Sequence, residues 1–326
     1  MAAQLNPAAI PVGVVGLGLM GSSIVASLLM SGHTGVGIAP LPDDLEAGPR
    51  RIREQLVQCA AAGLLAATVE ECLSRLTVTD RYSALRDCRL LQECVVEKID
   101  IKKLVYRKIA AVAAPDAVIT SNTSAIPIST LQQLVPTPER FLGLHWAEPA
   151  YATRFLEITC GDQTAPEHAD WVFRLAHSWG KEPTLLRKDI RGFITNRLMY
   201  AVYREMLHLV EKGLVTAEDA DKAFRYDAGS WMTLMGIFRR MDYTGLEDAA
   251  AVFRYWFPRL SNHTGVPLIM RRMVREQARG IHDCNGFYAY TPQDARRWEA
   301  AFAGFNHDIH RLARLYPYNP VAPVNV

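Results

Sequence analysis

Two apolar segments in the middle of the chain each carry one ionisable residue. His145 closes the run 141–144, and Glu157 lies inside a second run near the end of GLHWAEPAYATRFLEI, residues 143–158. Both runs have the bulky, largely uncharged composition of short strands. Pro149 and a loop-like stretch separate them, so we expect the chain to double back and bring the two side chains together. Such a pair can transfer a proton, with the carboxylate orienting the imidazole, or it can be a structural hydrogen bond in the core.

A glycine-rich turn predicts a dinucleotide site. The sequence G-x-G-x-x-G follows a Val-rich strand at 12–15 and opens a helix. The first glycine allows a tight turn, the second lets backbone approach a pyrophosphate, and the third lets helix and strand pack closely. The free N–H groups of the helix start attract the phosphates, whereas the alternative is a turn that is merely rich in glycine. The predicted cofactor-binding residues of this turn are Gly16, Gly18, Leu19, Met20 and Gly21.

The order of the predicted elements indicates an α/β fold followed by helices. Strand and helix patterns alternate from residue 12 to about residue 124, which is typical of a doubly wound, Rossmann-like parallel sheet. From about residue 191 the apolar residues recur at helical spacing, without a convincing strand. We therefore predict a dinucleotide-binding domain at 1–190 and an all-helical domain at 191–326. The expected strands lie at 12–15 and 35–39 and at the starts of 89–113 and 117–124, and the expected helices at about 43–62 and 69–76.

The composition is that of an ordinary soluble globular protein. The 326 residues are 49% hydrophobic and 21% charged, with a formal net charge of +2. We expect neither nucleic acid nor a membrane surface as a partner. Six cysteines occur without a CxxC or zinc-like spacing, which favours free thiols in a reducing cytoplasm and no metal site. The first 42 residues lack Asp, Glu, Lys and Arg, but they also lack the basic start of a signal peptide and fit a buried strand and helix.

Four motifs in a fixed order carry a family resemblance. They are the glycine turn, SNTSAIPIS (121–129), GLHWAEPAYATRFLEI (143–158) and RGFITNRL (191–198), and MDYTGLED and NGFYAY follow in the helical part. With these motifs the chain resembles the 3-hydroxyacyl-CoA dehydrogenase family over nearly its whole length. The resemblance implies an NAD(P)-dependent oxidoreductase that interconverts a 3-hydroxyacyl and a 3-oxoacyl group on a small substrate, with a CoA thioester favoured. It also implies a homodimer joined through the helical domain.

The resemblance gives the polar residues their roles. His145 would take the proton from the substrate hydroxyl while hydride leaves for the nicotinamide. Glu157 would orient the imidazole and stabilise the imidazolium. Ser124 and Asn196 would hydrogen-bond the substrate oxygen, although each could instead cap a helix.

Four further positions match the cofactor site of the family. Glu97 and Lys102 correspond to contacts with the nicotinamide end, unless they form a solvated pair on a surface helix. Asn122, in SNTSAIPIS, is predicted beside them. Glu148 replaces an asparagine of the family next to the nicotinamide carboxamide, or it points to solvent before Pro149.

Two departures from the family pattern concern the cofactor and the carrier. Ala39 stands where a strand-terminal acidic residue normally binds the adenosine ribose, and Asp43 or Asp44 could substitute for it. The predicted cofactor is NAD, with NADP as the alternative. Gln55 and Ala62 stand where CoA-specific relatives carry a serine and a lysine. A CoA phosphate would have to be held by basic residues of the preceding segment, namely Arg50, Arg51 and Arg53.

Three other functions remain as alternatives. The first is a dehydrogenase of a non-CoA hydroxy acid, carnitine- or gulonate-like, on the same fold. The second is an enzyme of the hydroxyisobutyrate or 6-phosphogluconate type, whose catalytic lysine precedes an asparagine by four residues, where this chain has Gly192. The third is a non-catalytic, cofactor-binding or structural relative, against which the presence of both His145 and Glu157 argues.

Overall fold

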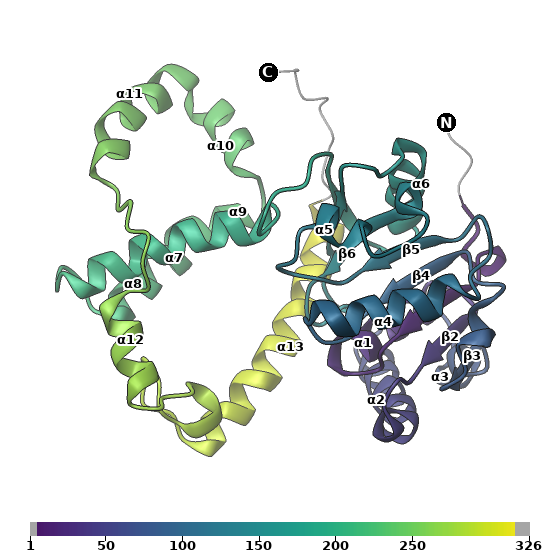
Figure 1. Ribbon diagram of the computed structural model, residues 1–326. Helices are drawn as coiled ribbons and strands as arrows, with labels where there is room; N and C mark the ends of the chain where they lie inside the picture. Colours follow the sequence, from purple (N-terminus) through teal and green to yellow (C-terminus); the bar gives the residue numbers. More distant parts are fainter. Residues whose placement is uncertain (1–4, 317–326) are drawn as a thin grey trace. The chain divides into compact units, whose positions relative to one another are not determined.

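The computed structural model describes residues 5–316 and divides into two compact units (Figure 1). The first unit ends at Ile194 and also includes Phe305–Arg311. The second comprises Thr195–Gly304 and the residues from Leu312 onward, so the last helix contributes residues to both. The sequence prediction places this boundary at residue 190. No helix among the described residues is both long enough and apolar enough to cross a membrane.

An eight-stranded sheet forms the centre of the first unit. Its strand order is β3-β2-β1-β4-β5-β6-β7-β8, and every neighbouring pair is parallel except β6 and β7, which are antiparallel. The predicted Rossmann-like α/β class is confirmed. The strands are β1 (Val12–Val15), β2 (Gly35–Ile38), β3 (Leu76–Thr79), β4 (Leu90–Glu93), β5 (Val118–Ser121), β6 (Phe141–Trp146), β7 (Phe155–Cys160) and β8 (Glu182–Leu186).

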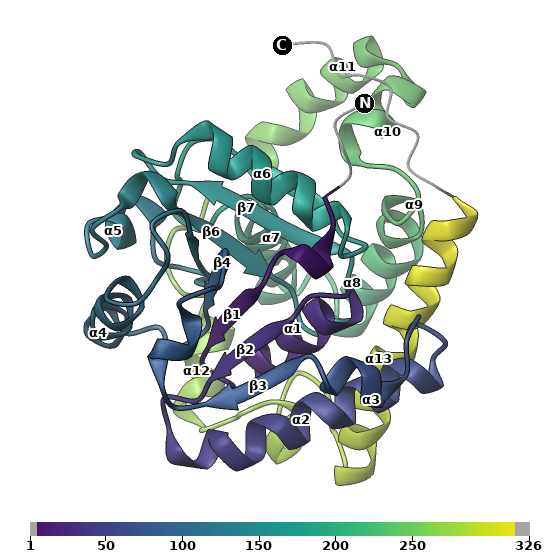
Figure 2. The same ribbon diagram turned by 90° about the vertical axis from the view of Figure 1, so that its right-hand side faces the viewer.

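Helices cover both faces of this sheet, as Figure 2 shows. Neighbouring strand residues point to opposite faces, so Leu90 and Leu91 enter two different cores. One core contains side chains of α1 (Leu19–Met30), α2 (Pro42–Ala61), α3 (Val69–Leu73) and α6 (Pro166–His177). The other contains side chains of α4 (Ile99–Ala110) and α5 (Ile128–Gln132). The sheet is therefore wound on both sides, and its strand ends stay accessible for a site.

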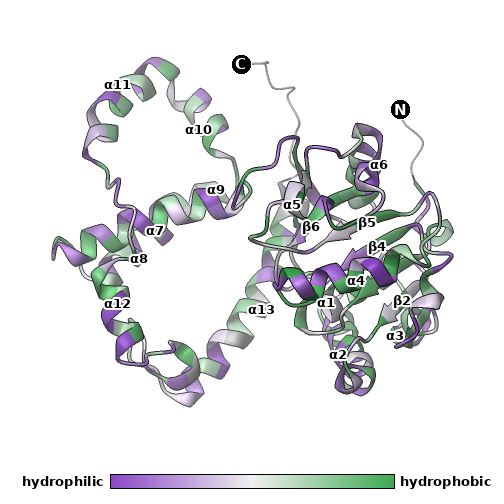
Figure 3. Ribbon diagram, viewed as in Figure 1, coloured by the Kyte–Doolittle hydropathy of each residue, from purple (hydrophilic) through white to green (hydrophobic). Residues whose placement is uncertain are grey.

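The second unit consists of helices and connecting turns. Among its described residues the only β-type pairings are isolated bridges that join Asn285 to Gly280 and Ala289. None of the helices from α7 to α12 contains a fully buried residue. Apolar side chains therefore remain in contact with solvent in this unit, and Figure 3 shows apolar and polar colouring alternating along its helices. The helices are α7 (Thr195–Glu211), α8 (Ala217–Ala223), α9 (Gly229–Met232), α10 (Ile237–Thr244), α11 (Leu246–Trp256), α12 (Leu268–Arg275) and α13 (Pro292–Leu315).

Candidate active site

The antiparallel step from β6 to β7 brings His145 and Glu157 together. The two residues are direct partners in the strand register, and His145 Nδ1 lies 3.2 Å from Glu157 Oε2. The Glu157 side chain is fully buried, whereas 14% of the His145 side chain is exposed. The prediction that the chain doubles back and pairs these residues is confirmed. An imidazole that donates Nδ1–H to this carboxylate presents Nε2 on the other side of the ring, where it can accept a proton.

The segment that follows β8 holds the second oxygen of this carboxylate. Ile194 N–H donates to Glu157 Oε1 at 2.7 Å. The preceding Phe193 is buried and has a φ of +51°, an uncommon left-handed conformation for a residue with a bulky side chain. Its ring lies 5.8 Å from the His145 ring, and the ring of Phe155 stands edge-on at 6.1 Å. Two aromatic rings and a fixed carboxylate therefore hold the imidazole in one orientation.

The loop after β5 carries Asn122 and Ser124. Asn122 Oδ1 accepts a hydrogen bond from Trp146 N–H at 2.9 Å, which ties this loop to the residue after His145. Ser124 is exposed, and its backbone N–H donates to Glu97 Oε1 at 2.8 Å. The structure thus ties Asn122 to the end of β6 and couples Ser124 to a carboxylate that follows β4.

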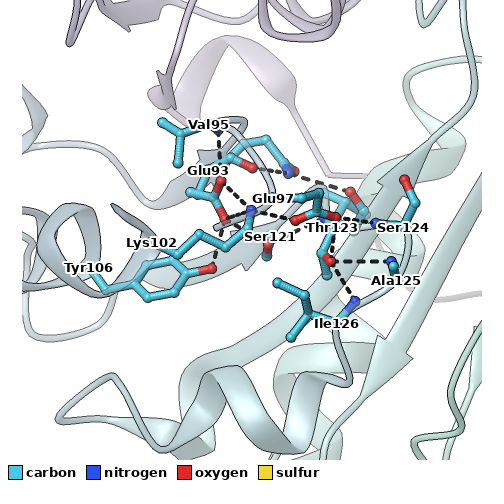
Figure 4. Close-up of polar contacts among 12 residues, drawn as sticks. Glu93, Val95, Glu97, Lys102, Tyr106, Ser121, Thr123, Ser124, Ala125 and Ile126 are labelled. Carbon is cyan, nitrogen blue, oxygen red and sulfur yellow. Dashed lines mark hydrogen bonds and ion pairs between the residues drawn. The ribbon is translucent and has the colours of Figure 1, made fainter. Parts of the chain in front are cut away.

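A buried carboxylate that the sequence analysis missed organises this region (Figure 4). Glu93, the last residue of β4, accepts hydrogen bonds from Lys102 Nζ at 2.8 and 2.9 Å, one to each carboxylate oxygen. Three further donors lie within 2.7 Å of its oxygens: Val95 N–H, Tyr106 O–H and Ser121 O–H. Burial and then the charge of Glu93 raise the pKa of Tyr106 well above its ordinary value. The Glu93 carboxylate is therefore held in place by donors from β4, α4 and β5 and from the turn after β4.

Lys102 links this buried carboxylate to the surface. Its side chain is only 1% exposed, and its Nζ lies 3.1 Å from Glu97 Oε2. Glu97 also accepts a hydrogen bond from Thr123 O–H at 2.7 Å. Burial raises the pKa of Glu97, but the Lys102 charge and the hydrogen bonds outweigh it, and the net shift is downward. The alternative of a solvated surface pair is wrong for Lys102, because the buried Glu93 draws its ammonium group inward.

The glycine turn has the shape that a pyrophosphate requires. Gly16 has a φ of +96°, and a Cβ at this position would lie 2.7 Å from the carbonyl oxygen of Cys94. A Cβ at Gly21 would overlap the carbonyl oxygen of Gly16, so α1 packs against the turn as predicted. At Gly18 a Cβ would meet no atom within 4 Å, which leaves the backbone open to a ligand. Leu19, the first residue of α1, is exposed, and Met20 is half-buried against the core. These residues fit a dinucleotide.

The connection between β6 and β7 is held by a buried lysine. Lys181 Nζ donates to the carbonyl oxygens of Ala150 and Thr153 and lies 5.3 Å from the centre of the Trp146 ring. Burial is the main cause that lowers the pKa of Lys181 to about 7. Glu148, at the start of this connection, is exposed and precedes Pro149 through a cis peptide bond. The remaining predicted residue, Asn196, is the second residue of α7 and belongs to the second unit.

Models of two protein domains match the chain. The NAD-binding domain of 3-hydroxyacyl-CoA dehydrogenase matches residues 11–190, and the C-terminal domain of the same enzymes matches residues 192–290. The chain belongs to the 3-hydroxyacyl-CoA dehydrogenase family. It is therefore an NAD-dependent oxidoreductase that acts on CH–OH groups.

Relatives within this family act on different substrates. The chain is 30% identical to 5-formyl-3-hydroxy-2-methylpyridine 4-carboxylate 5-dehydrogenase of Mesorhizobium japonicum, over 89% of this chain and 93% of the relative. It is 32% identical to an L-carnitine dehydrogenase of a Pseudomonas species, over 82% and 84%. Identity to mitochondrial hydroxyacyl-coenzyme A dehydrogenase of Sus scrofa is 30%, over 85% and 90%. A crystal structure of a 5-formyl-3-hydroxy-2-methylpyridine 4-carboxylic acid 5-dehydrogenase superposes with a TM-score of 0.86 at 29% identity, covering 93% of this chain and 98% of that one.

Proposed function

We propose that this dehydrogenase interconverts a 3-hydroxyacyl and a 3-oxoacyl group, with His145 as the general base. The observation that carries the proposal is the pairing of His145 with the fully buried Glu157 at 3.2 Å. A charge is costly to bury without partners. A carboxylate that is buried behind a partly exposed imidazole is suited to a ring that becomes positively charged.

The residues divide the chemistry between them. NAD, when bound, accepts the hydride that leaves the substrate carbon. Nε2 of His145 takes the hydroxyl proton, and Glu157 stabilises the resulting imidazolium because its other oxygen is fixed by Ile194 N–H at 2.7 Å. Ser124 and Asn196 are assigned to the substrate oxygen. In the reverse direction the imidazolium returns the proton.

The network around Glu93 supports the position of Ser124. Its backbone is tied to Glu97, Glu97 pairs with Lys102, and Lys102 is anchored by Glu93. A positioned hydroxyl is more effective than a mobile one, because misplacement of a substrate contact by about 1 Å can cost about 10²-fold in rate. We therefore assign Glu97 and Lys102 to the support of this loop as well as to the nicotinamide end of the cofactor, together with Asn122 and Glu148.

The residues that could bind a CoA carrier differ from those of CoA-specific relatives. Two of the three arginines that could hold a CoA phosphate are paired with carboxylates: Arg51 with Asp44 and Arg53 with Glu70, each at 2.6 Å. These pairs, together with the uncharged Ala62, favour a free hydroxy acid as a second candidate. Two relatives, the dehydrogenases of L-carnitine and of a pyridine carboxylate, agree with this second candidate.

A substrate panel tests both candidates. Purified protein is incubated with NADH and either 3-oxoacyl-CoA thioesters or free oxo acids, and with NAD and the corresponding hydroxy compounds, while absorbance of NADH is followed. Turnover of at least one 3-oxo or 3-hydroxy compound, lost in His145→Ala, supports the proposed reaction. NADH binding without turnover of any member of either series contradicts it and supports a non-catalytic relative.

We also propose a homodimer joined through the helical unit and a cytoplasmic location. Phe238 and Tyr243 of α10 are 83% and 76% exposed, and monomers rarely leave large apolar surface uncovered. All six cysteines are free, which suits a reducing compartment. Light scattering at micromolar concentration measures the oligomeric state, and a monomer there contradicts the dimer.

A further inference from the structure

The adenosine end of the cofactor site lacks the usual strand-terminal carboxylate. Gly16 N–H donates to the carbonyl oxygen of Ile38 at 2.9 Å, so the glycine turn lies against the end of β2. In Rossmann folds an acidic residue at this end accepts hydrogen bonds from the adenosine ribose hydroxyls. Here the chain continues with Ala39 and Pro40, whose side chains have no acceptor.

The next helix brings a carboxylate to the same corner. Asp44 lies in the first turn of α2, and Gly48 and Arg51 follow at four and seven residues, which places all three on one helix face. A Cβ at Gly48 would lie only 2.9 Å from Cβ of Leu17. This face of α2 is therefore packed directly against Leu17, the second residue of the glycine turn.

Arg51 joins the carboxylate to the turn. Its Nη2 donates to the Leu17 carbonyl oxygen at 2.5 Å and to Asp44 Oδ1 at 2.6 Å. The side chains of Asp44 and Arg51 are 17% and 31% exposed, so a ligand that lies over the turn can reach them. Asp44 also stands at the N-terminal end of α2, where the helix dipole is positive.

We propose that the Asp44–Arg51 pair sets the preference of this enzyme for NAD over NADP, with Asp44 replacing the missing carboxylate of β2. The ionised carboxylate accepts hydrogen bonds from the ribose hydroxyls and repels a 2′-phosphate. It also neutralises Arg51, a guanidinium that would otherwise bind that phosphate. The proposal concerns only the adenosine half of the cofactor, so it holds whichever hydroxy substrate is turned over.

Binding of the two reduced cofactors to Asp44→Asn tests the proposal. The full-length protein is titrated with NADH and with NADPH, and dissociation constants are taken from nicotinamide fluorescence and calorimetry. We expect the ratio of the NADPH constant to the NADH constant to fall roughly tenfold or more, which corresponds to one charge-assisted hydrogen bond. Asp43→Asn is the matched control, because Asp43 is the exposed neighbouring carboxylate of the same helical turn. Its ratio should stay within about twofold of wild type.

Arg51→Met tests the role of the Asp44–Arg51 pair independently. The variant removes both the anchor of Asp44 and the cation available to a phosphate, so NADH binding should weaken while NADPH binding does not improve. In Asp44→Asn/Arg51→Met the gain of NADPH binding should disappear. An unchanged ratio in folded Asp44→Asn, an equal shift in Asp43→Asn, or better NADPH binding in Arg51→Met overturns the proposal. Because binding is the readout, a failure here is distinct from a failure of the proposed reaction.

Discussion

The first unit contains two buried glutamates with different surroundings. Glu93 pairs with Lys102, and Glu157 pairs with His145. Glu93 is held by a lysine that is 1% exposed, by two hydroxyl groups and by a backbone N–H. Glu157 is paired with a histidine that is 14% exposed. The first pair is enclosed by further hydrogen-bond donors inside the fold, whereas the second includes an imidazole that takes up a proton in the proposed reaction.

This difference separates a positioning role from a chemical one. The donors around Glu93 compensate a charge that stays constant, so its loss should damage the fold and the loop that carries Ser124. His145, the partner of Glu157, gains a proton in the proposed reaction. Loss of the Glu157 carboxylate should therefore lower the rate of turnover more than the stability of the fold. The variants below test this division, beginning with the largest expected effect.

His145→Ala should lower kcat by about 10²–10⁴-fold or more, because the general base is removed. Steady-state kinetics on the substrate identified in the panel measure the effect. NADH affinity, measured by fluorescence, serves as the control and should remain close to that of wild type. Activity within a few fold of wild type would remove His145 from the mechanism.

Glu157→Gln should lower kcat by about 10²-fold or more while the protein stays folded, since an amide can neither stabilise the imidazolium nor impose the same tautomer. Thermal unfolding monitored by circular dichroism reports on the fold. If the variant unfolds and its remaining folded fraction has full specific activity, the pair with His145 is structural and the division fails.

Glu93→Gln should have the opposite profile. Removing one member of a buried ion pair leaves Lys102 uncompensated and should lower the free energy of unfolding by about 3 kcal/mol or more. The turnover of the folded protein should fall by at most about 10²-fold, through disturbance of the loop that carries Ser124. Denaturant unfolding and active-site-normalised kinetics measure the two quantities.

Glu97→Gln is the matched control for this variant, because the Glu97 side chain is 41% exposed. Its pairing with the same lysine should contribute about 0–1 kcal/mol. If Glu93→Gln and Glu97→Gln lose the same stability, burial does not make the Glu93–Lys102 pair stronger than the exposed Glu97–Lys102 pair.

Tyr106→Phe should have a smaller effect than Glu93→Gln. The ring keeps its edge-on contact with Phe141, whose centre lies 5.2 Å away, and only one donor to Glu93 is lost. The free energy of unfolding should fall by about 1–2 kcal/mol, and kcat should not change measurably. A large fall in kcat would show that the Glu93 cluster takes part in the chemistry.

The sequence predicted the parts of the site that adjacent motifs define. The doubling back between β6 and β7 was readable because both strands are apolar and a proline-containing loop joins them. The roles of the glycines followed from the dihedral and packing demands of the turn. Strands β3 and β8 were not predicted. They are the two edge strands of the sheet, with side chains that are mostly exposed or half-buried, so they lack the apolar run of a central strand.

The Glu93 cluster needed tertiary information that no single motif contains. Glu93 and Ser121 meet because they end two neighbouring parallel strands in register. The signal for Lys102 was present: it belongs to the buried face of α4 with Val105, Tyr106 and Ile109, at helical spacing. The sequence analysis predicted Lys102 at the nicotinamide end of the cofactor, with a solvated surface pair as the alternative. Its pairing with Glu93 was not predicted, because no motif links the end of β4 to this face of α4.

Lys181, which holds the connection between β6 and β7, makes the free energy of unfolding depend on pH in alkaline solution. Its pKa is about 7 in the folded protein and 10.5 ordinarily. Between these values the unfolded chain binds a proton that the folded protein does not bind, so this group makes the free energy of unfolding rise with pH, by about 1.4 kcal/mol per pH unit at most. Below pH 7 and above pH 10.5 its contribution is constant. Denaturant unfolding at a series of pH values should therefore show a steeper rise for wild type than for Lys181→Met. Between these two pH values, folding of the chain therefore releases a proton from Lys181.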